Sequence, residues 1–542
     1  MSLLADTLFT NARVRTLTGP DRAGTAEAVA VLGDRVVALE EVPARRVVDL
    51  GGAVVAPGFS DAHNHMAWYG LTLAEVDLRV GSMDELLDRV AERARETPEG
   101  EWVVGAGYDD NKVGGHPHRD ALDRAADGRP VWLRHTSGHM CTVSSAVLAR
   151  LGLAERGREV PGGVVVVDAD GRPTGVLQET AQELLNPLVL PYPVDVLVDA
   201  IERAARVYLR QGITRCVEAG IGGGWIGKSP VEVAAYQRAR DAGRLPVRVE
   251  LMVAAEVLHP LAGHADDGLP VGLDLGLRTG FGDDRLRIGP MKIFSDGSLI
   301  GHTAAMCHDF ADAPGERGYL QGEADDLRRT IVDAHRSGWR VAAHAIGDAA
   351  IDLVLDAYEE AQRRWPRPDP RHRIEHFGVA RDDQVTRAAA LGVVPVPQAR
   401  FVRELGDGFL RALGPKRAGQ AYRLRSLLDA GLVLPGSSDR PVVDGAPLLG
   451  MQDMVERRTA AGAAFGPAEA LTGLEALASY TVGSAQASHL EDRLGTLAPG
   501  MLADLVVLSD DPAAVAPDRI GAIEVLRTVV GGETAWDAEE GG

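Results

Sequence analysis

The stretch APGFSDAHNH at residues 56–65 decides how the fold is interpreted. It is a short apolar run that ends in two histidines, His63 and His65, separated by one residue. Side chains at positions i and i+2 of a β-strand point to the same face, so we expect the two imidazoles to converge at the end of a strand. Solvated or hydrogen-bonded histidines can have the same spacing, so the rest of the chain must decide between the two interpretations.

Seven further β-branched or apolar runs follow this stretch. They lie at 212–220, 247–256, 287–297, 339–348, 371–380, 392–399 and 431–440. Amphipathic helical stretches such as VEVAAYQRARDAG and DDLRRTIVDAHRSG follow most of them. Eight strands alternating with helices predict an α/β fold, specifically a (β/α)8 barrel. A doubly wound open sheet is the alternative, and the placement of the candidate ligands favours the closed barrel.

The two ends of the chain have the pattern of β-structure. Residues 1–57 and 490–542 contain short alternating runs separated by Gly, Asp and Pro turn signals. Neither end has enough strands for a stable sheet alone, so we predict one composite β-sandwich domain split between the termini, with the barrel at 58–489. The long gap after the first strand predicts an inserted α+β segment at 75–190 that folds over the barrel mouth.

Composition and charge exclude several classes of protein. Hydrophobic residues make up 45% and charged residues 25% of the 542 residues, which is typical of a globular protein. Lys and Arg number 57 against 78 Asp and Glu, for a net charge of −21. Such a surface repels phosphate and anionic lipid, so neither nucleic acid nor a membrane is expected as a partner.

Cysteine usage and hydropathy bear on location. Cys141, Cys216 and Cys307 are isolated and show no CxxC spacing, so a reducing cytoplasm is expected. Residues 1–17 lack the continuous apolar core of a signal peptide, and no run reaches the ~20 apolar residues of a membrane helix. A homodimer is the default expectation for assembly.

Further ionisable residues stand at the ends of the predicted strands. His344, His376 and Asp439 end the fifth, sixth and eighth runs, at the barrel end where active sites of this fold lie. With the first two histidines they form a nitrogen and oxygen donor set typical of zinc. Lys292 lies in the fourth run. A protonated lysine cannot ligate a metal, but its carbamate could bridge two cations. Pairing with Asp296 or Asp439, or binding of a substrate carboxylate, are alternatives.

These motifs resemble a known family. APGFSDAHNH resembles the PGF-[IVS]-D-x-H-x-H signature of the amidohydrolase superfamily, and the order HxH, Lys, His, His, Asp resembles its binuclear subtype with a carboxylated lysine. KIFSDGSL, AAHAIGD, HTSGHM at 135–140 and LGTLAPGMLADLVVL are similar to the YtcJ-like branch (amidohydrolase family 3), which includes N-substituted formamide deformylases. The likeness covers nearly the whole chain.

The resemblance implies two divalent metal ions, expected to be zinc, and a small-molecule substrate. His63, His65 and Asp439 would hold the first ion, His344 and His376 the second, and carboxylated Lys292 would bridge them. A metal-bound hydroxide would attack an amide or N-formyl carbon, because bound Zn²⁺ brings the pKa of water to about 7.

In that mechanism Asp439 would act as general acid and base, moving a proton to the departing nitrogen. Mononuclear zinc on His63, His65 and Asp439 is an alternative. A cyclic amidase or deaminase activity at the same site is another. A non-catalytic binding barrel should have lost ligands, and none is lost.

Weaker candidates surround this set. His135 and His139 in the insertion could contact substrate or stabilise an oxyanion. Asp296, Ser298 and His302 lie in the loop after the fourth strand, where the branch often has Arg in place of His302. Structural or loop contacts are the alternative for each of them.

Asp348 and a glycine-rich loop at 222–229 are further candidates. Asp348 could orient the imidazole of His344. Residues 222–229, GGGWIGKS, match the phosphate-loop pattern, with Lys228 and Ser229 at the phosphate and magnesium positions. A glycine-rich loop over the barrel mouth is favoured instead, because the preceding strand is already the second of the barrel.

Overall fold

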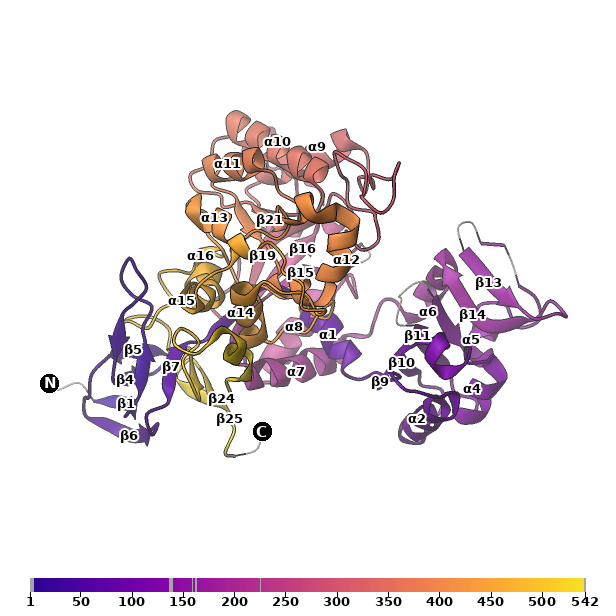
Figure 1. Cartoon of the computed structure of the whole chain (residues 1–542), viewed down its shortest axis with the longest axis horizontal. Helices are drawn as coiled ribbons and strands as arrows, with labels where there is room; N and C mark the ends of the chain where they lie inside the picture. Colours follow the sequence, from indigo (N-terminus) through magenta and orange to yellow (C-terminus); the bar gives the residue numbers. More distant parts are fainter. Residues whose placement is uncertain (1–3, 136–139, 158, 161–162, 225, 541–542) are drawn as a thin grey trace. The chain divides into compact units, whose positions relative to one another are not determined.

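The computed structural model describes residues 4–135, 140–157, 159–160, 163–224 and 226–540. The chain divides into two compact units, residues 1–67 with 201–542, and residues 68–200. The larger unit contains a seven-stranded parallel sheet and two sheets built from the chain ends, and the smaller unit contains a six-stranded sheet of its own (Figure 1).

Seven parallel strands form the central sheet of the larger unit, in the order β22-β21-β20-β19-β16-β15-β8. They are β8 (Phe59–Asn64), β15 (Ile213–Ile221), β16 (Arg248–Ala254), β19 (Leu286–Phe294), β20 (Val341–Ala345), β21 (Arg373–His376) and β22 (Val394–Val396). Each overlaps one of the first seven predicted runs. Each strand also pairs with the strand before it in the chain, which is the strand order of a barrel. The fold is therefore α/β with a nearly closed, barrel-like parallel sheet.

The eighth predicted run, residues 431–440, is not a strand, so this part of the prediction is wrong. Pro435 has no N–H to donate to a sheet ladder. Near the end of the run Asp439 adopts a left-handed backbone with φ of 59°, which no regular strand contains. Residues 434–440 are buried but cannot continue a ladder.

This segment nevertheless bridges the two edges of the central sheet. On one side Ala62 N, in β8, donates to Gly436 O at 2.9 Å. On the other side Ser437 Oγ donates to Pro397 O, next to β22, at 3.1 Å. Residues 431–440 therefore close the ring by isolated hydrogen bonds instead of by an eighth regular strand.

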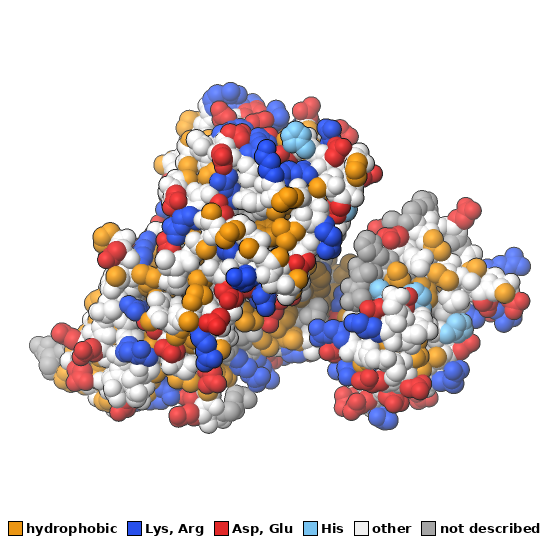
Figure 2. Space-filling view, viewed as in Figure 1, with side chains coloured by type: hydrophobic (Ala, Val, Ile, Leu, Met, Phe, Trp, Pro, Cys, Tyr) orange, Lys and Arg blue, Asp and Glu red, His pale blue; other side chains and the backbone are white. Residues whose placement is uncertain are grey.

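Helices follow most strands, as the amphipathic stretches predict. Helices α1 (Met66–Thr72) and α7 (Val194–Arg210) each include the point where the chain passes from one unit to the other. The helices of the larger unit are α8 (Glu232–Asp241), α9 (Ala324–Arg336), α10 (Asp348–Arg364), α11 (Asp382–Ala390), α12 (Ala399–Ala418), α13 (Arg425–Asp429), α14 (Pro447–Glu456), α15 (Gly473–Ala478) and α16 (Ser484–Gln486). Helices α9, α10 and α11 lie next to one another along the sheet (Figure 1). In Figure 2 acidic and basic side chains are interspersed over the visible face.

Charged side chains are buried among the central strands. Glu250 forms an ion pair with Arg215, and Arg340 Nη1 lies 3.7 Å from Glu250 Oε1. Arg373 binds Glu375 through Nε at 2.7 Å and Nη2 at 2.9 Å. All five side chains are buried. Glu250 and Glu375 are therefore each compensated by arginine, as buried charges require.

Strands from the two chain ends pair with each other. One sheet has the order β5-β4-β1-β6 and the other β25-β24-β23-β7-β2-β3. Their bounds are β1 (Ala5–Thr10), β2 (Arg13–Arg15), β3 (Thr25–Ala26), β4 (Val29–Leu32), β5 (Arg35–Ala38), β6 (Ala44–Asp49), β7 (Val54–Pro57), β23 (Leu505–Leu508), β24 (Val525–Val530) and β25 (Glu533–Asp537). β23 runs antiparallel to β7, and a shared apolar cluster includes Val31, Val55 and Val507.

The smaller unit folds around its own sheet, in the order β13-β14-β12-β11-β10-β9. Its elements are β9 (Val76–Asp77), α2 (Met83–Glu96), β10 (Val103–Tyr108), α3 (Asp110–Val113), α4 (Arg119–Ala125), β11 (Val131–His135), β12 (Met140–Val143), α5 (Ser145–Arg150), β13 (Gly163–Val167), β14 (Pro173–Glu179) and α6 (Asn186–Val189). Two apolar clusters, one under α2 and α4 and one under α5, stabilise it. Its position over the barrel mouth stays a prediction.

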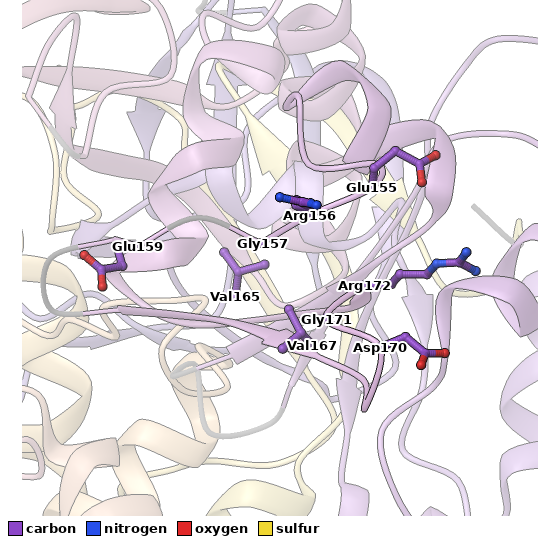
Figure 3. A pocket seen from close by; sticks show the side chains of 9 residues that line it. All are labelled: Glu155, Arg156, Gly157, Glu159, Val165, Val167, Asp170, Gly171 and Arg172. Carbon is purple, nitrogen blue, oxygen red and sulfur yellow. The ribbon is translucent and has the colours of Figure 1, made fainter.

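A cavity of about 690 Å³ lies in this unit, beside the β13–β14 hairpin (Figure 3). Val165 and Val167 line it, together with charged side chains such as Arg156 and Arg172. None of the predicted site residues that the structure describes lines it.

In the described part of the chain no single helix is both long enough and apolar enough to cross a bilayer. Among the same residues one bent pair, Ala181–Val189 and Val194–Arg210 with 104° between its halves, passes by length and composition together.

Candidate metal centre

His63, His65 and Asp439 meet at the carboxyl end of the central sheet. Alternation along β8 directs both imidazoles to one face, and Asp439 N donates to His63 O at 2.7 Å, which ties the closing segment to this strand. The left-handed backbone at Asp439 turns its carboxylate toward the histidines. Asp439 Oδ1 lies 3.3 Å from His63 Nε2 and 3.1 Å from His65 Nε2. These three residues could hold a metal ion.

The other two predicted histidines join the same cluster. The ring centroids of His63 and His376 are 5.1 Å apart, and those of His344 and His376 are 4.4 Å apart. All four imidazoles are buried. The structure therefore brings together five of the six predicted metal ligands within contact of one another.

Lys292, the sixth, is buried on β19. Its Nζ lies 4.9 Å from the ring centroid of Phe294. Among the described residues no ion pair within 4 Å includes Lys292, so the predicted pairing with Asp296 or Asp439 is not formed. Burial lowers the pKa of Lys292 to about 8, which brings the neutral amine within reach near neutral pH.

Hydrogen bonds fix which nitrogen of each imidazole carries the proton. His63 Nδ1 lies 2.5 Å from Glu375 Oε2, and His344 Nε2 lies 3.0 Å from Gly297 O. Both partners are acceptors, so these nitrogens are the protonated ones. The opposite nitrogens, His63 Nε2 and His344 Nδ1, are buried without a hydrogen-bond partner among the described residues.

This arrangement fits a cation. His63 Nε2 and Asp439 Oδ1 face each other at 3.3 Å, and both are acceptors in this tautomer. Two lone pairs so close are stabilised by a positive charge between them, either a shared proton or a metal ion. His344 Nδ1, which has no hydrogen-bond partner among the described residues, offers a further lone pair that could bind a cation.

Electrostatics favour the same interpretation. Burial lowers the pKa of His376 to about 3 and that of His65 to about 4. Burial raises the pKa of Asp439, but His63 and His65 beside its carboxylate lower it more, and the net pKa is well below the ordinary value. Neutral imidazoles and an ionised carboxylate are the forms that bind metal ions.

Sequence reasoning missed the groups behind the imidazoles. Glu375 holds His63, and Gln398 Oε1 accepts a hydrogen bond from His376 Nδ1 at 2.7 Å. Glu218 Oε1 lies 3.8 Å from His65 Nδ1. A signal for Glu375 was present, because Arg and Glu two positions apart in an apolar strand indicate a buried ion pair on one face.

The weaker candidates have other partners. Asp296 is buried, and its carboxylate accepts hydrogen bonds from the backbone N–H groups of Ala305, Ile346 and Gly347. Burial raises the pKa of Asp296 to about 7. His302 Nε2 lies 3.0 Å from Asp312 Oδ1. Both residues thus organise the loops that follow the strands.

Asp348 does not orient His344, contrary to the expectation. Its Oδ1 accepts from Cys307 N at 2.8 Å and its Oδ2 lies 3.4 Å from Arg381 Nη1. The partner of the His344 imidazole is a backbone carbonyl instead, that of Gly297.

In the smaller unit His135 pairs with Asp110, at 3.0 Å from Nε2 to Oδ1. Asp109 lies beside this pair, so these three residues form a second group that could hold a metal. The ring of His116 lies 6.1 Å from that of His135. His139 lies outside the described residues.

Two amides of the glycine-rich loop at 222–229 are bound by a carboxylate of the chain. Gly222 N and Lys228 N donate to Glu232 Oε2 at 3.1 and 2.9 Å. Glu232 is buried at the start of α8. These two amides are therefore already used by Glu232, which favours a structural role for the loop over a phosphate site.

Comparisons with known proteins extend the assignment. The chain matches the amidohydrolase family over residues 46–535. YtcJ of Bacillus subtilis (strain 168) is 32% identical over 508 residues, 91% of each chain. An N-substituted formamide deformylase of Arthrobacter pascens is 32% identical over 564 residues, 99% of each chain. The crystal structure of an uncharacterized metal-dependent hydrolase from Pyrococcus furiosus superposes with a TM-score of 0.77 at 29% identity, covering 94% of this chain and 99% of that one.

The fold, the donor set and these relatives define the class: the protein is a metal-dependent hydrolase. The family match spans most of the chain. The chain therefore belongs to the amidohydrolase family, and it is an enzyme that hydrolyses carbon–nitrogen bonds other than peptide bonds. The resemblance seen in the motifs is confirmed.

Proposed function

We propose that the protein hydrolyses an amide or N-formyl bond of a small molecule at a centre of two divalent cations, which we expect to be zinc. His63, His65 and Asp439 would hold one cation, and His344 and His376 the other. The observation that carries the proposal is the pair of buried imidazole nitrogens that have no hydrogen-bond partner among the described residues and belong to this cluster. The donor set is of the nitrogen and oxygen type that zinc prefers.

Lys292 is proposed to bridge the two positions as a carbamate. Its buried amine has a pKa lowered by burial to about 8, so a neutral fraction is available to attack CO₂, with loss of one proton and a gain of one negative charge. The product is an anion with two oxygens, which supplies the acceptor that the protonated amine lacks.

Bound cations would supply a nucleophile near neutral pH and polarise the scissile carbonyl. The chain's own residues handle the proton. Asp439 Oδ1 lies 3.1 Å from His65 Nε2, within the cluster where attack would occur. We propose that Asp439 accepts the proton of the attacking water and passes it to the departing nitrogen, as general base and then general acid.

Names of relatives support an N-formyl or amide substrate. The Arthrobacter pascens relative, similar over almost the whole chain, is an N-substituted formamide deformylase. A cyclic amidase or deaminase activity would use the same donor set. The product therefore distinguishes an amide or N-formyl hydrolase, a cyclic amidase and a deaminase.

The test combines metal analysis with a panel of N-substituted formamides, linear amides, cyclic amides and amidines. We expect zinc to co-purify, activity to be lost with chelator and restored by zinc, and an amine plus formate or another carboxylate as products. Less than ~half an equivalent of metal with chelator-insensitive activity would contradict the proposal. Ammonia released from an amidine would assign a deaminase instead.

A further inference from the structure

The imidazoles of the candidate metal centre differ in the charge of the group behind them. His63 donates to a carboxylate of Glu375, His376 to the side-chain amide of Gln398, and His344 to the backbone carbonyl of Gly297. Two of the three acceptors are neutral, and one is an ionised acid. The difference is built into the fold, because all of these groups are buried.

The contact between His63 and Glu375 is rigid and closed to solvent. Both side chains are fully buried, and the two atoms are 2.5 Å apart. Arg373 holds the same carboxylate with two hydrogen bonds and also donates from Nη2 to Ala62 O at 2.7 Å. Ala62 directly precedes His63 in β8. Glu375 therefore binds the imidazole of His63, and Arg373 binds both Glu375 and the strand that carries His63.

An ionised carboxylate can only accept hydrogen bonds. Arg373 donates to both oxygens of the Glu375 carboxylate, from Nε at 2.7 Å and from Nη2 at 2.9 Å, which favours the ionised form. His63 must therefore carry its proton on Nδ1 and present the lone pair of Nε2 to the cluster. The adjacent negative charge also makes Nε2 a stronger donor than an imidazole bound to a neutral acceptor.

Negative charge is therefore unequal between the two cation positions. The position at His63, His65 and Asp439 has one carboxylate in direct reach and a second behind His63. The imidazoles at the other position, His344 and His376, donate their hydrogen bonds to neutral oxygens. Asp296 Oδ1 lies 3.5 Å from His344 Nε2 but accepts its hydrogen bond from Ile346 N.

We propose that Glu375 is a positioning residue for His63, and that it makes the His63–His65–Asp439 position the tighter cation position and the first to fill. The inference rests on the proposed metal centre. It goes beyond that proposal because it ranks the two positions and assigns the ranking to a residue that touches neither the cation nor the substrate.

Glu375 could instead serve only to neutralise buried Arg373. Glu250 provides the matched control, because it is equally buried and is likewise paired with arginines, Arg215 and Arg340. No histidine takes part in the described ion pairs of Glu250. Loss of either carboxylate leaves a buried arginine uncompensated, but only one of them acts on an imidazole.

The experiment measures zinc affinity of the full chain by competition with a chromophoric chelator, together with the thermal midpoint of the metal-free protein. We expect wild type to bind zinc in two steps of different affinity. Glu375→Gln should weaken the tighter step about 10- to 100-fold, the usual effect of removing such a partner. Glu250→Gln should lower the thermal midpoint but leave the zinc affinity of that step unchanged.

Each other outcome decides against a specific statement. Unchanged zinc affinity in Glu375→Gln, or equal weakening in both variants, overturns the role of Glu375. Wild type that binds no zinc in either step overturns the metal centre itself, which is a separate failure.

A measurement on the metal-free wild type keeps the test independent of variant folding. Histidine ¹⁵N NMR, with the His63 signal assigned by its loss in His63→Asn, should show His63 protonated at Nδ1. Protonation of His63 at Nε2 overturns the proposal. Glu375→Asp, which keeps the charge, should retain most of the zinc affinity lost in Glu375→Gln.

Discussion

Two regions of this protein gather histidines and aspartates at the ends of parallel strands, and they differ in how those groups are satisfied. In the barrel-like sheet His63 Nε2 and His344 Nδ1 are buried without hydrogen-bond partners among the described residues. In the smaller unit β10 and β11 also run parallel, but His135 Nε2 is paired with Asp110 at 3.0 Å, and Asp110 is partly exposed.

A third pair of histidines shows that burial alone is not the deciding property. His335 and His372 are buried, and His335 Nδ1 lies 2.8 Å from His372 Nε2. The other nitrogen of His335 lies 2.8 Å from Trp365 O, and that of His372 accepts from Val341 N at 3.0 Å. A candidate metal site is therefore recognised by buried imidazole nitrogens that lack a partner, because an unpaired buried acceptor is costly unless a cation binds it.

The largest expected effect separates the two aspartate and histidine groups. His63→Ala combined with His65→Ala should abolish tight zinc binding and lower kcat/KM about a thousandfold or more, since cations contribute several kcal/mol to such transition states. His135→Ala with Asp110→Ala should leave the zinc content measured by elemental analysis unchanged. Loss of zinc in His135→Ala with Asp110→Ala would show that the smaller unit also binds zinc.

Lys292→Ala tests the bridge within the barrel-like sheet. We expect one zinc equivalent fewer and activity lowered about a hundredfold, with partial recovery on adding short-chain carboxylates that replace the carbamate. Elemental analysis and rates with and without acetate measure both. Two tightly bound zinc ions in Lys292→Ala would show that the lysine is not a ligand.

The paired histidines should respond to protons and not to zinc. Burial lowers the pKa of His335 and of His372 relative to about 6.5 in the unfolded chain, so the unfolded state binds more protons. Stability conferred by the neutral pair is complete above pH 6.5 and is lost as the pH falls below it, at about 1 kcal/mol per pH unit for each imidazole while it titrates.

Urea unfolding checks this expectation, measured between pH 8 and pH 5 on protein from which a chelator has removed the metal. His335→Phe combined with His372→Phe should flatten the pH dependence while zinc affinity stays as in wild type. An identical slope in this variant would assign the acid sensitivity to other groups.

The smallest effect is expected for Asp110→Asn in the smaller unit. Its ion pair with His135 is partly open to solvent, and such pairs contribute about 0–1 kcal/mol. Urea unfolding should change by no more than that, with kcat/KM on the best substrate as a second readout. A fall in kcat/KM above tenfold without loss of stability would give this group a role in catalysis.

The local pattern of the sequence was enough to place most of the barrel-like sheet and the candidate ligands at the ends of its strands. Seven of the eight predicted strands are present, because alternation and β-branched runs reflect the conformation of each segment separately. His63 and His65 converge because two-residue spacing acts within one strand. The prediction of an eighth strand is wrong because Pro435 and the left-handed backbone at Asp439 prevent a regular ladder of hydrogen bonds.

The alternation of strands with helices and the spacing of the candidate donors follow from the sequence alone, since both depend on neighbouring residues. Which groups lie behind those donors depends on the tertiary structure. Glu375 and His63 are 312 positions apart, and His376 follows Glu375 directly yet reaches the same cluster because its φ of 70° turns the end of the strand. Such partners depend on which segments become neighbours in the barrel-like sheet, and local periodicity does not encode these neighbours.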